Sequence, residues 1–222
     1  MQKEIYKWIY KFNPIKENKI HNSDFQIVPE NKINKPLTLF KYYSLNKFAI
    51  NNLIQNQVYA SHPCQFNDIF DCSEDLIEFD DTDAIKSFLS KTFSPEIIKK
   101  GIEESREQVE DFVKRHFKEL VYRKIGVLCL TENSNNNLMW SYYSNHKGFV
   151  IEYDYQSFPF NFYGPFPVNY QNKVVPIKTS EVNTPLAMLF QSNIKQKIWK
   201  HEKEWRILIP SENKDMISPS FE

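Results

Sequence analysis

The chain is poor in glycine and cysteine, and it has no long apolar segment. Only 4 of its 222 residues are glycine, which disfavours Rossmann and P-loop proteins because their phosphate-binding fingerprints need several glycines in a short stretch. Three cysteines, an odd number, argue against a disulfide framework and are typical of a reducing compartment. Apolar runs such as Ile125–Leu130 are far shorter than the roughly 20 residues of a membrane span. Met1–Tyr10 is charged and lacks the apolar centre of a signal peptide. We therefore expect a cytoplasmic globular protein without a membrane segment.

Neither sign of charge is in excess. Lys plus Arg and Asp plus Glu both total 28, so the formal net charge is zero. A balanced chain does not indicate nucleic acid or an anionic membrane as the partner, and this disfavours a nuclease. Aromatic residues are abundant instead, with 18 Phe, 12 Tyr and 4 Trp, which predicts a core and a partly exposed surface rich in rings.

The chain divides into an N-terminal arm, residues 1–36, and a single domain, residues 37–222. Glu4–Lys11 is predicted as a short helix, because Ile5, Trp8 and Ile9 fall on one helical face. Prolines punctuate the polar remainder of the arm, which favours a loop that becomes ordered on a protein partner.

The pattern of the domain predicts many short strands that do not alternate regularly with helices. We expect strands at Leu37–Tyr43, Gln57–Ser61, Ile125–Thr131, Gly148–Tyr153, around Val168–Ile177 and at Glu204–Ile209. We expect helices after an N-cap at Ser44, from Ser94 to Leu120, at Leu138–Ser144 and at Pro185–Trp199. The prediction is a mixed α+β fold with mainly antiparallel, short-stranded sheets and flanking helices.

The first candidate for chemistry is Glu202-Lys203-Glu204-Trp205-Arg206. On a strand, Glu202, Glu204 and Arg206 would share one face, with Trp205 on the opposite, core-facing side. Two close carboxylates repel, which raises the pKa of one of them, while Arg206 opposes that shift. Such a pair can polarise a hydroxyl and stabilise a nearby developing cation. The structural alternative is a solvated face of an edge strand with a cross-strand ion pair.

A second candidate is the segment Met139–Glu152, which gathers aromatic and polar residues around a glycine. Trp140, Tyr142, Tyr143 and His146 precede Gly148 and a predicted strand. Rings with a polar end are suited to stacking against a planar ligand. Alternatively, the Trp and Tyr rings belong to the core and His146 donates within a turn.

Two further groups are interpreted as structural. Phe66–Asp71 predicts an Asx-turn or helix cap at Asn67 and Asp68, with Phe66 and Phe70 as anchors. His62, Cys64 and Cys72 lack a zinc-type spacing, so we expect no metal site, and Cys129, inside a predicted strand, is expected to be inert.

Taken together, the segments resemble a bacterial family catalogued as domain of unknown function 2971, some members of which accompany phage-defence or toxin systems. The matching stretches are Leu39–Leu45, Val58–Pro63 with Phe66–Asp68, Leu138–Tyr143 with His146 and Gly148, and Glu202–Arg206.

The order of elements also resembles that of ADP-ribosyltransferases. In that family a first strand orients NAD with Arg or His, a second carries a Ser motif, and a late strand carries a catalytic Glu within E-x-E or Q-x-E. Here Lys41 or Tyr42 stands at the first position, Ser61 at the second and Glu202 with Glu204 at the last. Ser61 lies in Ala-Ser-His-Pro, not in the family's usual Ser-Thr-Ser.

The resemblance implies roles for these residues and NAD as substrate. Glu204 would stabilise an oxocarbenium-like ribose, and Glu202 would orient or deprotonate a macromolecular acceptor. Lys41, Tyr42 and Ser61 would contact NAD, together with the second segment's Trp140, Tyr142, Tyr143 and His146. We thus expect an NAD-consuming toxin or phage-defence effector, acting as an ADP-ribosyltransferase or glycohydrolase. The alternative is a non-catalytic module of such a system that senses a nucleotide or binds a protein partner.

Overall fold

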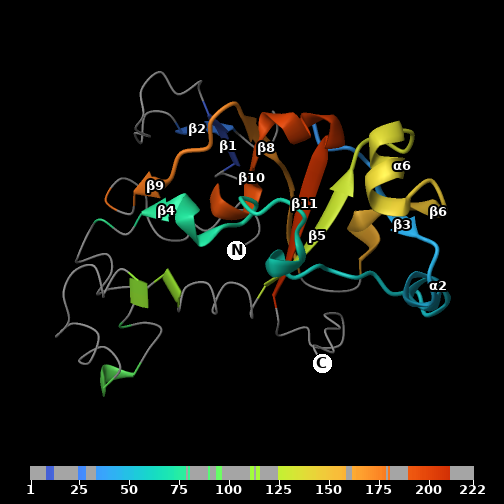
Figure 1. Ribbon diagram of the computed structural model, residues 1–222, viewed down its shortest axis with the longest axis horizontal. Coiled ribbons are helices and arrows are strands. Elements are labelled where there is room, and N and C mark those ends of the chain that lie inside the picture. The colour runs from blue at the N-terminus through green and yellow to red at the C-terminus, as the bar shows by residue number, and fades with distance from the viewer. Residues whose placement is uncertain are drawn as a thin grey trace.

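The computed structural model describes residues 9–12, 25–28, 34–78, 80, 90, 94–96, 111–112, 114–115, 125–158, 162–178, 180 and 190–210. These residues form a mixed α+β structure around a five-stranded antiparallel sheet with the order β6-β3-β5-β11-β7. Figure 1 shows β5 and β11 side by side at the centre, with α6 close to β3 and β6. The predicted fold class is therefore confirmed at this level.

The helices and strands are short. They are β1 (Ile9–Phe12), β2 (Phe25–Val28), β3 (Leu39–Ser44), α2 (Lys47–Ile54), the 3-10 helices η4 (Pro63–Gln65) and η5 (Glu74–Leu76), β4 (Ile77–Glu78), β5 (Ile125–Thr131), α6 (Asn137–Ser144), β6 (Gly148–Tyr153), η6 (Tyr155–Ser157), β7 (Tyr163–Pro167), β8 (Asn169–Gln171), β9 (Ile177–Lys178), β10 (Ile194–Gln196), η7 (Lys197–Glu202) and β11 (Glu204–Pro210). In the described part of the chain, three additional strand pairs occur outside the main sheet: β1 with β2 antiparallel, and β10 with β8 and β4 with β9 parallel.

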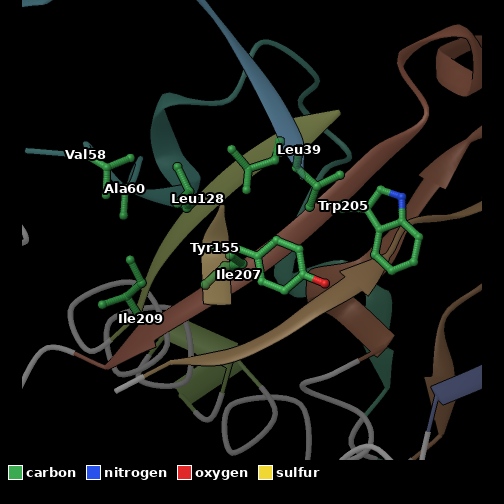
Figure 2. Packing of buried hydrophobic residues seen from close by; sticks show 9 residues of the cluster. Leu39, Val58, Ala60, Leu128, Tyr155, Trp205, Ile207 and Ile209 are labelled. Carbon is green, nitrogen blue, oxygen red and sulfur yellow. The ribbon is translucent and has the colours of Figure 1, made fainter. Parts of the chain in front are cut away.

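One face of β11 packs into the main core. Trp205, Ile207 and Ile209 alternate along the strand and are all buried. Figure 2 shows them with Leu128 from the neighbouring strand β5 and Leu39 from β3. Burying each such side chain stabilises the fold by about 1.5–3 kcal/mol. The predicted core-facing side of the strand is thus confirmed, and Glu204 and Arg206 project from the opposite face.

The turn between α6 and β6 brings the helix close to β3. Asn145 and His146 adopt left-handed backbone conformations, with φ of 49° and 55°. At Gly148 a Cβ atom would overlap the Tyr43 carbonyl oxygen, so β6 approaches β3 closely because this residue has no side chain.

Several predicted elements agree with the structure. The strands at Ile125–Thr131 and Gly148–Tyr153 are confirmed with their boundaries. The helix at Leu138–Ser144 is confirmed with one additional residue, Asn137. The strand predicted at Leu37–Tyr43 is β3, and Gln57–Ser61 joins the sheet through a bridge between Ser61 and Val127.

Other predictions need correction. The cap of α2 is Asn46, whose side chain accepts from the Ala49 amide, and not Ser44. The predicted helix Glu4–Lys11 is wrong in its described part, since Ile9–Phe12 forms strand β1, which pairs with β2.

The predicted helix Pro185–Trp199 is wrong at Ile194–Gln196, whereas residues 197–199 lie in the 3-10 helix η7. Residues 190–193 are helical, but Ile194–Gln196 is strand β10. Phe190 and Ile194 are both buried, and their spacing of four residues fits a helix equally well, so the local pattern was misleading. Most of the long helix predicted from Ser94 to Leu120 lies outside the described residues, as does the first part of this one. Among the helices that the structure describes, none is long and apolar enough to cross a membrane.

Candidate functional site

A cavity of about 360 Å³ lies on the charged face of β11 and is lined by side chains from β3, α6 and the loop before η5. Its charged lining residues are Lys41, Asp71, Lys195, Glu202 and Glu204. Its aromatic lining residues are Phe40, Tyr42, Phe66, Tyr142 and Tyr143. Neutral polar groups complete the wall, among them Ser61, Gln65, Asn67 and Thr131. This mixture of rings and convergent polar groups is typical of a small-molecule site.

Lys195 on β10 connects three carboxylates that line the cavity. Its Nζ lies 2.7 Å from Glu202 Oε2, 3.2 Å from Glu204 Oε2 and 3.4 Å from Asp71 Oδ2. All four side chains are buried. Burial lowers the pKa of Lys195, but the nearby carboxylates, Glu204 first among them, more than offset this and raise it.

Arg206 closes the same network from β11. Its Nε and one terminal nitrogen donate to Glu204 at 2.8 and 3.1 Å, and both terminal nitrogens donate to Asp71 at 2.7 and 2.6 Å. It also donates to the Ser192 carbonyl at 2.8 Å, and the Phe66 ring lies 5.3 Å from its guanidinium carbon. The Arg206 side chain is 0 % exposed, so these hydrogen bonds replace the ones that its nitrogens would make with water in the unfolded chain.

The network holds three carboxylates against two cations, which leaves one formal negative charge. Burial raises the pKa of Glu204, but Arg206 and Lys195 outweigh burial and lower it to about 2. Glu204 is therefore ionised at any physiological pH. The reading of E-x-E as a solvated edge-strand face is wrong, because β11 lies between β5 and β7 and these side chains are buried.

Glu202 reaches the site from outside the strand. It is the last residue of η7, and Lys203, with φ of 43°, turns the chain into β11. The expectation that Glu202 and Glu204 share a strand face is therefore wrong, although both reach the cavity and both contact Lys195. Glu202 also accepts from the Tyr143 hydroxyl at 2.5 Å.

Lys41 and Cys129 face one another across β3 and β5. The Lys41 amine donates to the Cys129 carbonyl at 3.3 Å and lies 5.8 Å from the Tyr43 ring centre. Burial lowers the pKa of Lys41, with Glu204 opposing that effect. Burial and the Glu204 charge raise the pKa of the Cys129 thiol, which agrees with the predicted inertness of this cysteine.

The predicted ligand-contacting residues separate into two groups. Lys41, Tyr42, Ser61, Tyr142 and Tyr143 line the cavity. Trp140 and His146 are not among its lining residues.

Trp140, outside the cavity, and Tyr42, which lines it, both make contacts that stabilise the fold. The Trp140 ring packs edge-on against Tyr42 with centroids 5.1 Å apart, and His146 is an exposed turn residue. The Tyr42 hydroxyl donates to the Asn133 carbonyl and accepts from the Asn136 amide, so this ring braces a loop. Tyr142, which is 59 % exposed and lines the cavity, is the better placed ring for stacking.

The loop Phe66–Asp71 combines the predicted structural role with one that the sequence did not reveal. Asp68 accepts from the Phe70 amide at 3.0 Å, which confirms the Asx-turn. Phe66 packs against the core, but Phe70 is 53 % exposed and is not an anchor. Asp71, three residues after Asp68, pairs with Arg206 across the site.

Sequence reasoning missed Asp71 and Lys195 as site residues. The buried amine belongs to Lys195, in the segment predicted as a helix. A lone Lys beside a buried Ile carries no local signal of burial, since Lys is almost always exposed. Within the described part of the chain, no group of His, Cys, Asp and Glu is arranged to hold a metal ion.

Comparison with known proteins gives no relative: no family model, no curated protein and no solved structure matches the chain.

Proposed function

We propose that this protein binds NAD in the cavity and cleaves its nicotinamide–ribose bond, as an ADP-ribosyltransferase-like or glycohydrolase effector of a toxin or phage-defence system. The observation that carries the proposal is convergence. Lys41, Ser61 and Glu204 come from three distant segments, were expected together because of the resemblance to ADP-ribosyltransferases, and line one cavity.

The charge of the site supports this chemistry. Departure of nicotinamide leaves an oxocarbenium-like ribose, which a fixed negative charge stabilises. The pKa of Glu204 is lowered to about 2, so its carboxylate already carries that negative charge at neutral pH. The network around it keeps one formal negative charge that its own cations do not cancel.

The occupied oxygens of Glu204 limit how it meets a ribose hydroxyl. Arg206 and Lys195 donate to it, and the Cys129 thiol adds a weaker hydrogen bond. A thiol is a poor donor, so a ribose hydroxyl entering the cavity would replace Cys129 and leave the cationic partners in place.

The test is release of nicotinamide from NAD, followed by chromatography, with wild-type protein and Glu204→Gln. We expect release by the wild type and its loss, by about 100-fold or more, in the variant. Since Glu204→Gln also disturbs a buried network, the matched control is Ile207→Ala, on the opposite face of the same strand and 0 % exposed. That control loses about 2–5 kcal/mol of stability but keeps the cavity lining.

Nicotinamide release that is unchanged by Glu204→Gln, or reduced equally by Ile207→Ala, would reject the role of Glu204. No release by the wild type under any condition would reject the enzymatic proposal.

A second candidate is a non-catalytic module that binds a nucleotide in the same cavity. It is favoured by one observation: Glu204 is already paired with Arg206 and Lys195, as in a purely structural ion network. Calorimetry separates the two, because a binding module titrates with NAD at a fixed stoichiometry and the recovered ligand is intact.

A further inference from the structure

The two glutamates of the site, Glu202 and Glu204, differ in the groups that lie between the carboxylate and a ligand in the cavity. Glu202 is 2 % exposed, and each of its oxygens has a partner. Oε1 accepts from Tyr143 at 2.5 Å, and Oε2 accepts from Lys195 at 2.7 Å. An incoming hydroxyl therefore meets the partners of Glu202 before it meets the carboxylate.

Tyr143 is the partner that also faces the cavity. Its backbone carbonyl accepts from the Ser44 hydroxyl at 2.7 Å, which ties this part of α6 to β3. Its ring is half-buried and lines the cavity. The phenol has a single proton, and this proton is donated to Glu202, so its oxygen offers acceptor positions to a ligand. Burial and the Glu202 carboxylate raise the pKa of Tyr143, which keeps the phenol protonated at rest.

We infer that Tyr143 is a catalytic residue that takes the proton of the acceptor hydroxyl or water while passing its own proton to Glu202. This inference rests on the proposed function, and it replaces direct deprotonation by Glu202. Lys195 cannot accept a proton, because its amine is held charged by three carboxylates.

The step balances in atoms and charge. The nicotinamide nitrogen leaves with the electron pair of its bond to the ribose carbon, which neutralises the pyridinium. The acceptor oxygen forms the new bond to that carbon with a lone pair and gives its proton to the Tyr143 oxygen. The original phenol proton moves to Glu202 Oε1, 2.5 Å away, and leaves Glu202 as a neutral acid. Lys195 remains paired with Glu204 and Asp71, so no cation is left unpaired.

Comparing the rate of nicotinamide exchange with the rate of NAD hydrolysis separates the role of Tyr143 from the role of Glu204. Labelled nicotinamide recombines with the ribose cation to give labelled NAD, and this reaction needs no acceptor proton. Tyr143→Phe should therefore lower hydrolysis about 100-fold while exchange persists and KM changes little. Glu204→Gln should lower both reactions, because the cation itself is no longer stabilised.

The matched control is Tyr155→Phe, which also removes one phenolic hydrogen bond, 2.8 Å to the Pro36 carbonyl, from a residue of the core. It should leave both reactions unchanged. Glu202→Gln should reproduce the Tyr143→Phe result, and combining the two should cost little more than either alone, since both interrupt one proton path. If Tyr143→Phe does not fold, as judged by its thermal transition, 3-fluorotyrosine at position 143 carries the test, because it keeps the hydrogen bond to Glu202 but makes the phenol more acidic. It should shift the pH dependence of hydrolysis and not that of exchange.

The outcomes are distinct. Wild-type protein that neither hydrolyses NAD nor exchanges nicotinamide overturns the proposed function and the proton path together. With an active wild type, unchanged hydrolysis in the variants, or equal loss of hydrolysis and exchange, overturns the proton path alone.

Discussion

Replacing Arg206 should be the most damaging single change to this site. Arg206 is 0 % exposed and makes charge-assisted hydrogen bonds to both Asp71 and Glu204. Arg206→Met keeps most of the volume but removes one of the two cations that are paired with the three carboxylates. Lys195 would then be the remaining buried partner of all three, with two formal negative charges uncompensated.

The magnitude follows from the cost of leaving buried charge unpaired. Removing one partner of a buried ion pair costs about 3–5 kcal/mol, against a total stability of about 5–15 kcal/mol for a native domain. At about 2–4 °C per kcal/mol for a chain of this size, the midpoint should fall by roughly 6–20 °C. Urea denaturation should show a lower midpoint with an unchanged slope, if the unfolded state is unaffected.

Two variants at the same network sharpen the comparison. Arg206→Lys keeps the charge but loses the planar fork that serves two carboxylates at once, so its stability should lie between that of the wild type and Arg206→Met. Glu204→Gln removes a carboxylate and leaves the network formally neutral, so it should cost less than Arg206→Met. Two results would refute the count of three carboxylates and two cations in this network. One is equal stability of the wild type and Arg206→Met, and the other is a larger loss of stability in Glu204→Gln than in Arg206→Met.

Two further predictions concern pH and packing. The folded-state pKa of Glu204 is lowered to about 2 from an ordinary 4.5, so its contribution to stability is complete above about pH 5 and is lost as the pH falls towards 2. The urea midpoints of the wild type and Glu204→Gln should therefore converge over this range. A difference between the midpoints that stays constant with pH would contradict the lowered pKa of Glu204. Gly148→Ala should destabilise the protein by about 1–3 kcal/mol or more, because its Cβ would overlap the Tyr43 carbonyl oxygen. In the same denaturation assay, Lys147→Ala, at an exposed neighbouring position, should change the free energy of unfolding by no more than about 0.5 kcal/mol.

The strands of the main sheet could be predicted because their patterns are local. Ile125–Thr131 is a continuous apolar run, as a central strand needs, and Gly148–Tyr153 has residues of high strand propensity after a turn. The alternation of Trp205, Ile207 and Ile209 gave the core face of β11 correctly. In each case the residues that decide the conformation lie within a few positions of one another.

The site could be predicted only in part, because its energetics depend on distant residues. Whether β11 is an edge or an inner strand depends on β7, some 40 positions earlier, and this placement turns Glu204 from a solvated residue into a buried one. Asp71 and Arg206 are separated by 135 positions. The burial of Lys195 depends on the pairing of β10 with β8, which the helical spacing of Phe190 and Ile194 obscured.

The closed ion network divides the chemistry between the two glutamates. Glu204, held ionised by Arg206 and Lys195, cannot exchange protons near neutral pH, so it can act only through its charge. Glu202 shares Lys195 with Glu204 but has Tyr143 on its other oxygen, and that phenol faces the cavity. In the proposed reaction, proton transfer and charge stabilisation would therefore fall on different side chains, and Lys195 contacts both glutamates. A change at Lys195 should consequently impair both functions, whereas changes at Tyr143 and Glu204 should separate them.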